Sequence, residues 1–298
     1  MKYSLSIILL CFAIQAIGQI KGKVLNVTTN QPIPYTNIWV KYQNTGTTSD
    51  ENGNFSFENI SDTSLLIFSA LSFEKQTIKV RDFNGIIELK PIAIELETVT
   101  ISPPKSQQQI KTGKVKKRDV SVWYCSGNRP YRMGKIFHYK EDYKKTPFIN
   151  TIEFVANTHK INRKVLIHVY EVGEGTPENW NILAQNIECN VRKGDKINTL
   201  DLTSHQIKMS KSGVMIVIES LIIDSNFYEF EIKNSQTGQM MTIRRFEPCF
   251  GTIPTETTET TWVYRGKWTQ QQHKQSASSP KKYINKYTEL AMELILSN

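Results

Sequence analysis

One spacing in the chain could in principle hold a metal ion. His168-Val169-Tyr170-Glu171 reads His-x-x-Glu, and an imidazole nitrogen and a carboxylate oxygen are both ligands that catalytic zinc accepts. The segment alternates as a strand does, however, and residues three apart on a strand face opposite sides. A third ligand would have to come from His205 or His273, and neither lies in a recognisable context. We therefore interpret His168 as a structural residue and predict no metal site.

The sequence contains no motif for nucleophilic or phosphate chemistry. It has no Gly-x-Ser-x-Gly elbow, and Ser126-Gly127 and Ser212-Gly213 are interpreted as turns. It also has neither a phosphate-binding loop nor a dinucleotide-binding glycine motif. A glycosidase would need two carboxylates roughly 5 to 9.5 Å apart, and no pair of acids is singled out. We predict no catalytic residue and no cofactor, with a hydrolase of unrecognised site as one alternative.

Aromatic residues near the C-terminus could recognise a sugar. Trp262, Tyr264 and Trp268 fall at even spacing on one predicted strand, beside a threonine-rich stretch over residues 252–261. An exposed face of this kind could stack against a pyranose ring, so these three are the candidate ligand-binding residues of a glycan hypothesis. The alternative is that the rings fill a core or cap the edge of a sheet.

Oxygen-bearing side chains gather at Asp50-Glu51-Asn52-Gly53, which raises the question of calcium. A calcium loop needs six to eight oxygens, including a late bidentate carboxylate, and too few are at hand here. Asp and Asn favour turn positions, and Gly supplies a positive φ. The segment therefore predicts a hairpin turn.

The N-terminus has the three parts of a secretory signal peptide. A short basic start, Met1-Lys2-Tyr3, precedes an apolar run from Leu5 to Ile14, and Ala16-Ile17-Gly18 supplies small residues before Gln19. The apolar run is shorter than the roughly 20 residues that a membrane-spanning helix needs. We predict that residues 1–18 are removed and that the mature chain, without a transmembrane span, is exported. Its location would be periplasmic, outer-membrane-associated or secreted.

The cysteines permit at most one intramolecular disulfide in the exported chain. Cys11 lies in the predicted signal peptide, and its lipidation is disfavoured because the large Leu10 stands where a small residue is expected. Cys125, Cys189 and Cys249 remain, and the sequence does not say which of them pair. Their spacing is typical neither of a zinc knuckle nor of a redox motif.

Length and composition predict two soluble domains. The chain has 298 residues, 39% of them hydrophobic and 22% charged, which excludes collagen-like, wholly disordered and multi-span membrane proteins. Of the net charge of +9, six units come from residues 102–118, SPPKSQQQIKTGKVKKR. This stretch predicts a solvated linker, with contact to an anionic membrane surface or lipopolysaccharide as the alternative. It lacks aromatic residues for stacking on bases, so we expect no nucleic-acid partner.

Residues 19–101 predict a β-sandwich of about seven short strands. Alternating segments start at Ile20 and Tyr35, and further strands are expected over 73–80, 86–89 and 92–101. Leu65-Leu66-Ile67-Phe68 is a continuous apolar run, as in a central strand that is buried on both faces. No segment has the periodicity of an amphipathic helix.

These residues resemble the carboxypeptidase-regulatory-like domain. The resemblance rests on the following motifs: Gly22-x-Val24, Gln31-Pro32-Ile33-Pro34-x-x-Asn37-Ile38, Gly46-Thr47-x-x-Asp50-x-x-Gly53-x-Phe55 and the ending Ile94–Ile101. It departs from the family at Gln31, where a glycine is usual. The resemblance implies a transthyretin-like, non-catalytic sandwich whose usual roles are structural support or interaction. The domain of this family also occurs in outer-membrane receptors, but the 197 residues after Ile101 are too few for a receptor's plug and barrel.

Residues 119–298 predict a larger antiparallel β-sandwich of jelly-roll type with nine or ten strands. Val214–Ile218 is apolar throughout and should lie in the middle of a sheet. The closing run Leu290–Leu296 fits a short helix or a strand, and we expect a strand. The order of strands resembles, more weakly, the C-terminal region of bacterial secreted proteins that carry the same first domain. That resemblance implies no activity.

The sequence as a whole predicts an exported, non-enzymatic binding or scaffold protein of the bacterial cell envelope. Its two domains are expected to be independent, since a linker separates them. A carbohydrate-binding module in the second domain is the alternative within the binding class, and a hydrolase is the alternative outside it. Cell-envelope proteins or glycans are the expected partners, and the oligomeric state is left open.

Overall fold

The computed structural model describes residues 19–43, 45–92, 108–234 and 237–298. The predicted signal peptide over 1–18 and the predicted strand beyond Ile92 lie outside these residues. Strands dominate the described chain, and its helices are 3-10 turns of three to five residues, so the all-β prediction is confirmed. Within the described ranges no helix is both long and apolar enough to cross a membrane.

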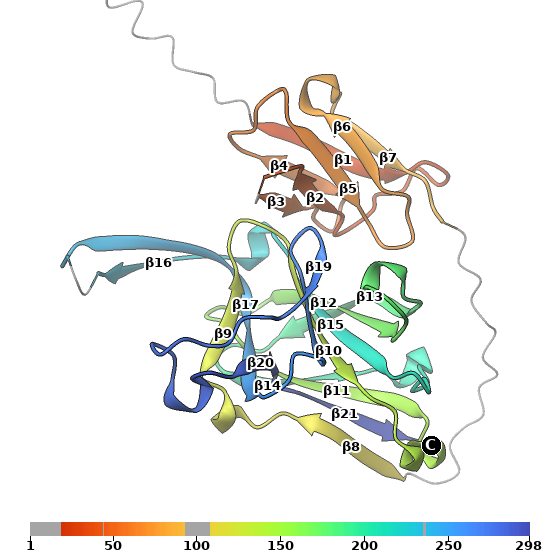
Figure 1. Cartoon of the computed structure of the whole chain (residues 1–298). Coiled ribbons are helices and arrows are strands. Elements are labelled where there is room, and N and C mark those ends of the chain that lie inside the picture. The colour runs from red at the N-terminus through yellow and green to blue at the C-terminus, as the bar shows by residue number, and fades with distance from the viewer. Residues whose placement is uncertain (1–18, 44, 93–107, 235–236) are drawn as a thin grey trace, which may run out of the picture.

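The first domain is a sandwich of seven strands in two sheets (Figure 1). A three-stranded sheet in the order β4-β1-β7 packs on a four-stranded sheet in the order β3-β2-β5-β6. Alternate residues of both sheets, among them Val24, Ile38 and Phe68, fill the space between them. The predicted β-sandwich is therefore confirmed; the seven strands of the described residues include β3, which is not among the expected strands, and all but Ile92 of the strand expected over 92–101 lies outside those residues. The strands are β1 (Ile20–Asn26), β2 (Asn37–Val40), β3 (Gly46–Thr48), β4 (Asn54–Phe57), β5 (Leu65–Ser69), β6 (Gln76–Lys79) and β7 (Ile86–Leu89). The 3-10 turn η1 (Val80–Asp82) follows β6 directly.

The predicted hairpin turn at Asp50 is present between β3 and β4. Asp50 Oδ1 accepts the backbone N–H groups of Asn52 and Asn54 at 2.9 and 2.7 Å. Gly53 has a φ of 75°, and a Cβ there would approach the carbonyl oxygen of Val24 to 2.6 Å. The carboxylate therefore serves the turn.

The second domain is a sandwich of two antiparallel sheets. A six-stranded sheet has the order β13-β12-β15-β10-β18-β19, and an eight-stranded sheet contains the path β16-β17-β11-β21-β8. The strands of the first are β10 (Tyr131–Phe137), β12 (Arg163–Glu171), β13 (Ile182–Val191), β15 (Val214–Ser220), β18 (Thr261–Tyr264) and β19 (Trp268–Gln270). Those of the second are β8 (Gln109–Lys114), β9 (Val122–Ser126), β11 (Phe148–Asn157), β14 (Lys196–Asp201), β16 (Phe227–Lys233), β17 (Met240–Thr255), β20 (Tyr287–Leu290) and β21 (Met292–Ser297).

Short 3-10 turns complete the second domain. They are η2 (Lys117–Asp119), η3 (Glu141–Lys145), η4 (Pro177–Asn179), η5 (Thr203–His205), η6 (Asp224–Asn226) and η7 (Lys281–Tyr283). The described part of residues 119–298 forms thirteen strands, β9 to β21, more than the nine or ten expected, because several strands are short or carry charged residues that mask their pattern. The closing run forms β20 and β21 with a break at Ala291, so the strand expectation is confirmed.

Strand β15 is buried on both faces, as its apolar run predicts. Ile216 and Ile218 point into the core between the two sheets, which Phe154 and Leu294 of the eight-stranded sheet also enter. Met215 and Val217 point the other way, into a cluster that includes Trp39 of the first domain. The first domain thus covers the outer face of the six-stranded sheet.

The second half of the predicted linker is a strand, which corrects the boundary at residue 119. Strand β8 pairs antiparallel with β21, from Gln109 opposite Ser297 to Lys114 opposite Met292. Only Ile110 of β8 packs against the core, and the other side chains face water or pair at the surface. A strand at a sheet edge needs so few apolar residues that its composition matches that of a linker.

Candidate interaction site

The three candidate sugar-binding residues are buried. Trp262 and Tyr264 lie on β18 and Trp268 on β19, so a hairpin rather than one strand carries them, and Tyr264 pairs with Trp268 across it. Their exposed fractions are 8, 7 and 6%. They pack with Trp39 of the first domain and with Trp180. The glycan hypothesis needs an exposed face, and at these residues the structure has instead the filled core of the alternative interpretation.

Beneath these rings a buried carboxylate joins the two domains. Glu219 on β15 lies between Arg132 on β10 and His168 on β12, because those strands flank β15 in the sheet. Arg132 places Nε 2.8 Å from Glu219 Oε2 and donates from Nη2 to Oε1 at 3.2 Å. His168 Nε2 is 2.6 Å from Oε2, and Asn37 Nδ2 of the first domain donates to Oε1 at 2.5 Å. All four side chains are buried.

The hydrogen bonds of His168 define its protonation state. The backbone N–H of Asn186 donates to His168 Nδ1 at 3.2 Å, so Nδ1 carries no proton and Nε2–H donates to Glu219. Burial lowers the pKa of His168, which agrees with a neutral ring. Burial alone would raise the pKa of Glu219, but Arg132 and His168 overcome it and hold this pKa at about 2. The cluster is therefore a carboxylate–guanidinium pair with a neutral histidine.

Further contacts fix the first domain on the second. In β2, Ile38 enters the core of the first domain, whereas Trp39 points outward and packs edge-on against Tyr264 with ring centres 5.9 Å apart. Ile222 donates its backbone N–H to Thr48 Oγ1 at 3.2 Å. The expectation of two independent domains is therefore wrong. Charged and apolar residues on the outer face of the six-stranded sheet hold the domains together. A sequence does not show that such residues face another domain.

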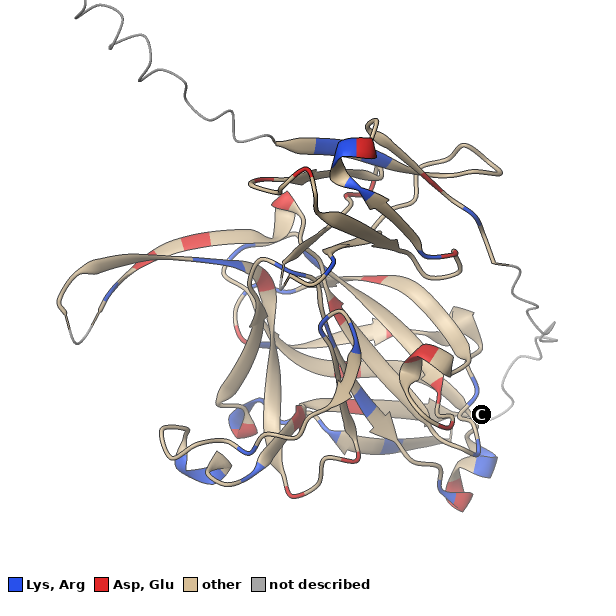
Figure 2. Cartoon of the chain, turned by 45° about the horizontal axis from the view of Figure 1, so that its top comes forward, with Lys and Arg blue, Asp and Glu red and all other residues tan. Residues whose placement is uncertain are grey.

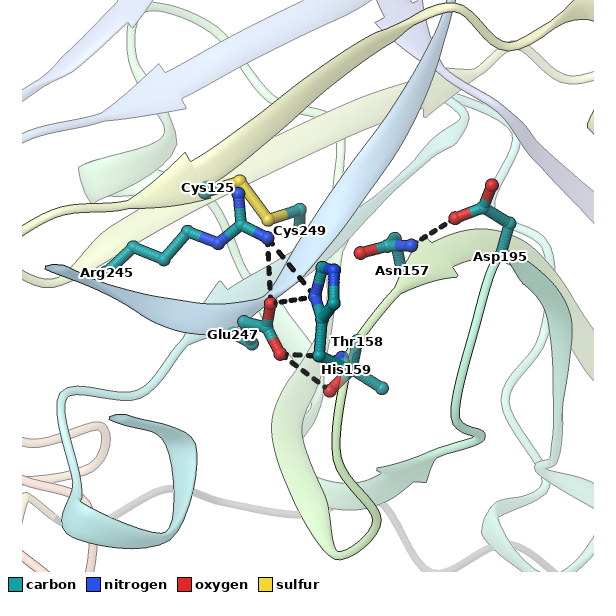
Figure 3. Close-up of a disulfide and its surroundings, with 8 residues drawn as sticks. All are labelled: Cys125, Asn157, Thr158, His159, Asp195, Arg245, Glu247 and Cys249. Atoms are coloured by element: carbon teal, nitrogen blue, oxygen red, sulfur yellow. Dashed lines mark hydrogen bonds and ion pairs between the residues drawn. A yellow bond between two sulfur atoms is a disulfide. The ribbon is translucent and has the colours of Figure 1, made fainter. Parts of the chain in front are cut away.

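A second buried carboxylate, Glu247, lies in β17 (Figure 3). It accepts the backbone N–H of His159 at 2.8 Å and the hydroxyl of Thr158 at 3.0 Å, both on Oε2. On Oε1 it contacts His159 Nδ1 at 2.7 Å and Arg245 Nη2 at 2.8 Å. Burial opposes ionisation of Glu247, but these donors hold its pKa below the usual range.

A disulfide stands beside Glu247. Cys249 of β17 is bonded to Cys125 of the neighbouring strand β9, while Cys189 is a buried free thiol whose pKa burial raises to about 11. The structure thus selects one pair where the sequence left the pairing open. The disulfide and the Glu247 hydrogen bonds anchor the same short stretch of β17.

From this anchor a two-stranded ribbon projects away from the body, visible in two orientations (Figures 1 and 2). We call it the arm and define it as β16 together with residues 240–246 of β17. Its strands pair from Phe227 opposite Phe246 to Lys233 opposite Met240. At its base the ring of His159 stacks on Tyr228 with centres 4.6 Å apart.

The arm has one apolar and one polar face. The pairing register places Tyr228, Phe230, Ile232, Met241 and Ile243 on one face, with Arg245 at its base. Towards the tip this face is uncovered, since Ile232 and Met241 are 41 and 43% exposed. The opposite face carries Glu229, Glu231, Thr242 and Arg244 over most of its length. The arm is therefore an amphipathic ribbon with an open apolar side.

A cleft of about 890 Å³ opens between the domains near the base of the arm. Its walls come from β3 and β4 of the first domain and from η6 and Phe246 of the second. Its charged lining residues are Lys21, Asp50, Glu51, Glu58 and Asp224, so acids outnumber bases in a chain whose net charge is +9.

The remaining histidine and carboxylate candidates have structural partners in the described part of the chain. His168 and Glu171 have separate partners, Glu219 for the first and Ser210 with Asn181 for the second, as opposite strand faces require. No group of three or more metal-ligating side chains occurs among the described residues. The hydrogen bonds found for His159 in this part of the chain lead to Glu247 and Arg245, not to a hydroxyl or thiol.

Sequence reasoning missed the residues that organise both clusters. Arg132 lies in YRMGKIF, whose two basic residues hide a strand that is buried at every position. Glu219 ends the apolar run VMIVIES, and a charge at that place is a signal that a buried partner exists. Glu247 has no such signal in its surroundings. The identity of each partner comes only from the sheet register.

Residues 20–101 match the family model of the CarboxypepD_reg-like domain. None of the curated proteins matches the chain. Among solved structures, the cysteine protease and lectin-like domains of Cwp84, a surface layer associated protein of Clostridium difficile, are 9% identical with a TM-score of 0.37. The alignment covers 89% of this chain and 58% of that one, less than two thirds of its length.

A DUF3823 family protein from Parabacteroides merdae is 10% identical, with a TM-score of 0.18 and coverage of 77% of this chain and 98% of that one. A structure of infectious bursal disease virus, Gx strain, is 10% identical, with a TM-score of 0.23 and coverage of 94 and 62%. Similarity at this level is too low to support an argument about function. The first domain of the chain, in contrast, is a CarboxypepD_reg-like domain, as its sequence motifs imply.

Proposed function

We propose that the chain is an exported, non-enzymatic binding or scaffold protein of the bacterial cell envelope, and that the arm is its contact surface. The observation that carries this proposal is the uncovered apolar face of the arm around Ile232 and Met241. A two-stranded ribbon is marginally stable by itself in water, so an arm held out from the body gains stability from a partner.

Two further features support the proposal. The Cys125–Cys249 disulfide suits an oxidising compartment outside the cytoplasm, and it anchors the arm at its base. The contacts between the domains make a continuous body from which the arm projects, as a scaffold requires. A CarboxypepD_reg-like domain, whose resemblance implies support or interaction rather than catalysis, then braces the outer face of the second domain.

Site-specific cross-linking in cells tests this function. A photoreactive phenylalanine analogue at Met241 is expected to yield a discrete adduct in the envelope fraction. The same analogue at Tyr42, which is 91% exposed on the first domain, is the matched control and is expected to yield none. Absence of an adduct from Ile232, Met240 and Met241 alike, or retention of the chain in the cytoplasm, would contradict the proposal.

A further inference from the structure

The two edges of the eight-stranded sheet differ in how they meet solvent. Strand β8 ends the sheet on one side, and Lys111 and Lys114 stand on it with Gly113 at a φ of 102°. Lysines and backbone irregularities on an edge strand discourage pairing with another chain. Strand β16 ends the sheet on the other side, with β17 as its strand neighbour.

The β16 edge lacks the protection that β8 has. Its regular pairing with β17 runs over seven residue pairs without a register shift. Alternate N–H and C=O groups of an edge strand point away from its one neighbour and are free to pair with another strand. With Phe227 at 38% and Ile232 at 41% exposure, this edge strand also exposes apolar side chains, between its charged residues. The arm therefore offers a template for an added strand.

The side chains of β16 define what an added strand must carry. On one face it would lie beside Tyr228, Phe230 and Ile232, which favours apolar side chains at alternate positions. On the other face it would lie beside Glu229 and Glu231, which favours lysine or arginine at the positions between. Glu229 already pairs with Arg244, but this pair is exposed and contributes little, and Glu231 has no ion pair in the described chain.

The surroundings of the arm agree with a basic partner. The cleft at its base has four acids and one base among its lining residues. Figure 2 shows acidic and basic residues on the ribbon of the arm itself, and the acids of β16 lie on the strand with the open edge. A second copy of the arm is less suited, because antiparallel pairing of two β16 edges would bring glutamates together.

We propose that an extended peptide segment of a partner protein, with apolar residues alternating with lysine or arginine, adds to the free edge of β16 as a further strand. This inference rests on the proposed function, because it names the partner of the same arm. Backbone hydrogen bonds along β16 supply affinity, and the alternating side chains supply specificity.

The test uses the full chain and a fluorescent synthetic peptide of alternating lysine and isoleucine. Fluorescence anisotropy is expected to detect binding of this peptide and not of its counterpart with glutamate in place of lysine. The double variant Glu229→Lys/Glu231→Lys is expected to bind the lysine peptide about tenfold more weakly and to bind the glutamate peptide instead. The matched control is Glu74→Lys/Glu88→Lys, which changes the net charge equally at exposed positions of the first domain.

Hydrogen exchange separates strand addition from simple charge attraction. The amides of residues 228–232 that point away from β17, at alternate positions, are expected to become protected with the lysine peptide and to remain unprotected with a backbone N-methylated version. Binding that ignores the Glu229→Lys/Glu231→Lys change, or that leaves these amides unprotected, would overturn the inference. Arm-dependent dimers in analytical ultracentrifugation, or arm-dependent binding to phosphatidylglycerol vesicles, would overturn it as well. A Met241 adduct in cells without peptide binding would leave the proposed function standing and remove only the peptide partner.

Discussion

The two buried glutamates of the second domain have nearly the same partners and opposite surroundings. Glu219 and Glu247 are 1 and 0% exposed, and each contacts one arginine, one histidine and at least one further donor. Around Glu219 the partners are sealed, since the side chains of Arg132 and His168 are 10 and 1% exposed. Around Glu247 the partners reach water, with Arg245 at 22% and His159 at 47%.

The two clusters therefore have different roles: the Glu219 cluster holds the two domains together, and the Glu247 cluster orients side chains at the base of the arm. The sealed Glu219 cluster lies where the two domains meet. Because water does not reach it, the buried charge or dipole of each group is compensated by the other groups of the cluster. The open cluster lies where the arm leaves the body, and it turns a histidine and an arginine toward the aromatic residues of the arm. The same carboxylate chemistry thus closes an interface in one place and orients an exposed surface in the other.

The comparison predicts unequal costs for removing the two carboxylates. Glu219→Ala leaves Arg132 buried without its counter-charge, and we expect a loss of about 3–5 kcal/mol in the free energy of unfolding. Glu247→Ala is expected to lose about 1–3 kcal/mol, because Arg245 and His159 regain water. Urea unfolding followed by fluorescence measures both values, and Glu229→Ala, in an exposed ion pair, is the control with under about 1 kcal/mol. Equal losses for the two buried sites would contradict the distinction.

Removing the disulfide is expected to affect the Glu247 cluster and not the Glu219 cluster. Cys125 and Cys249 are 124 residues apart in sequence, so removing their bond by Cys125→Ser/Cys249→Ser is expected to cost about 2–4 kcal/mol. The loosening should be local to the arm and its anchor. Hydrogen exchange is expected to accelerate at the N–H of His159, which Glu247 accepts, and not at the N–H of Asn186, which His168 accepts. Equal acceleration at both amides would mean that the clusters are not separate.

The sequence predicts the strands of the molecule better than the contacts between them and between the domains. Two-residue alternation and turn residues such as those at Asp50 identify the strands of the first domain, and the apolar run at Val214–Ile218 identifies a central strand. These signals are local, so one sequence contains them. Strand β10 cannot be recognised from the sequence because Arg132 and Lys135 interrupt its apolar pattern. Strand β8 cannot be recognised because, as an edge strand, it packs only Ile110 against the core.

The clusters and the docking of the domains depend on register and on contacts between distant residues. Asn37 and Glu219 are separated by 182 residues, and nothing in either segment points to the other. The evenly spaced aromatics Trp262 and Tyr264 are visible in the sequence, but whether such a face meets solvent or another domain depends on how the first domain packs. The arm is visible as two strands, and its exposure follows only from the absence of a covering element in the described structure.

The smallest expected effect concerns the charge state of His168 and appears as a dependence of stability on pH. The folded state lowers the pKa of His168, so the unfolded chain binds more protons as the pH falls below about 6.5, and stability falls with it. The loss attributable to this ring is at most about 1.4 kcal/mol for each pH unit below about 6.5, the limit for one proton. A second loss, from Glu219, follows below about pH 4.3, because its folded pKa of about 2 is lower than that of the unfolded chain. In His168→Gln the amide still donates to Glu219 but does not titrate, so the first loss should disappear while the second remains. Urea midpoints measured across this range, with the exposed His205→Gln as control, decide the matter: an unchanged slope between pH 7 and 5.5 in His168→Gln would mean that the ring is not held neutral by its burial and by the N–H of Asn186.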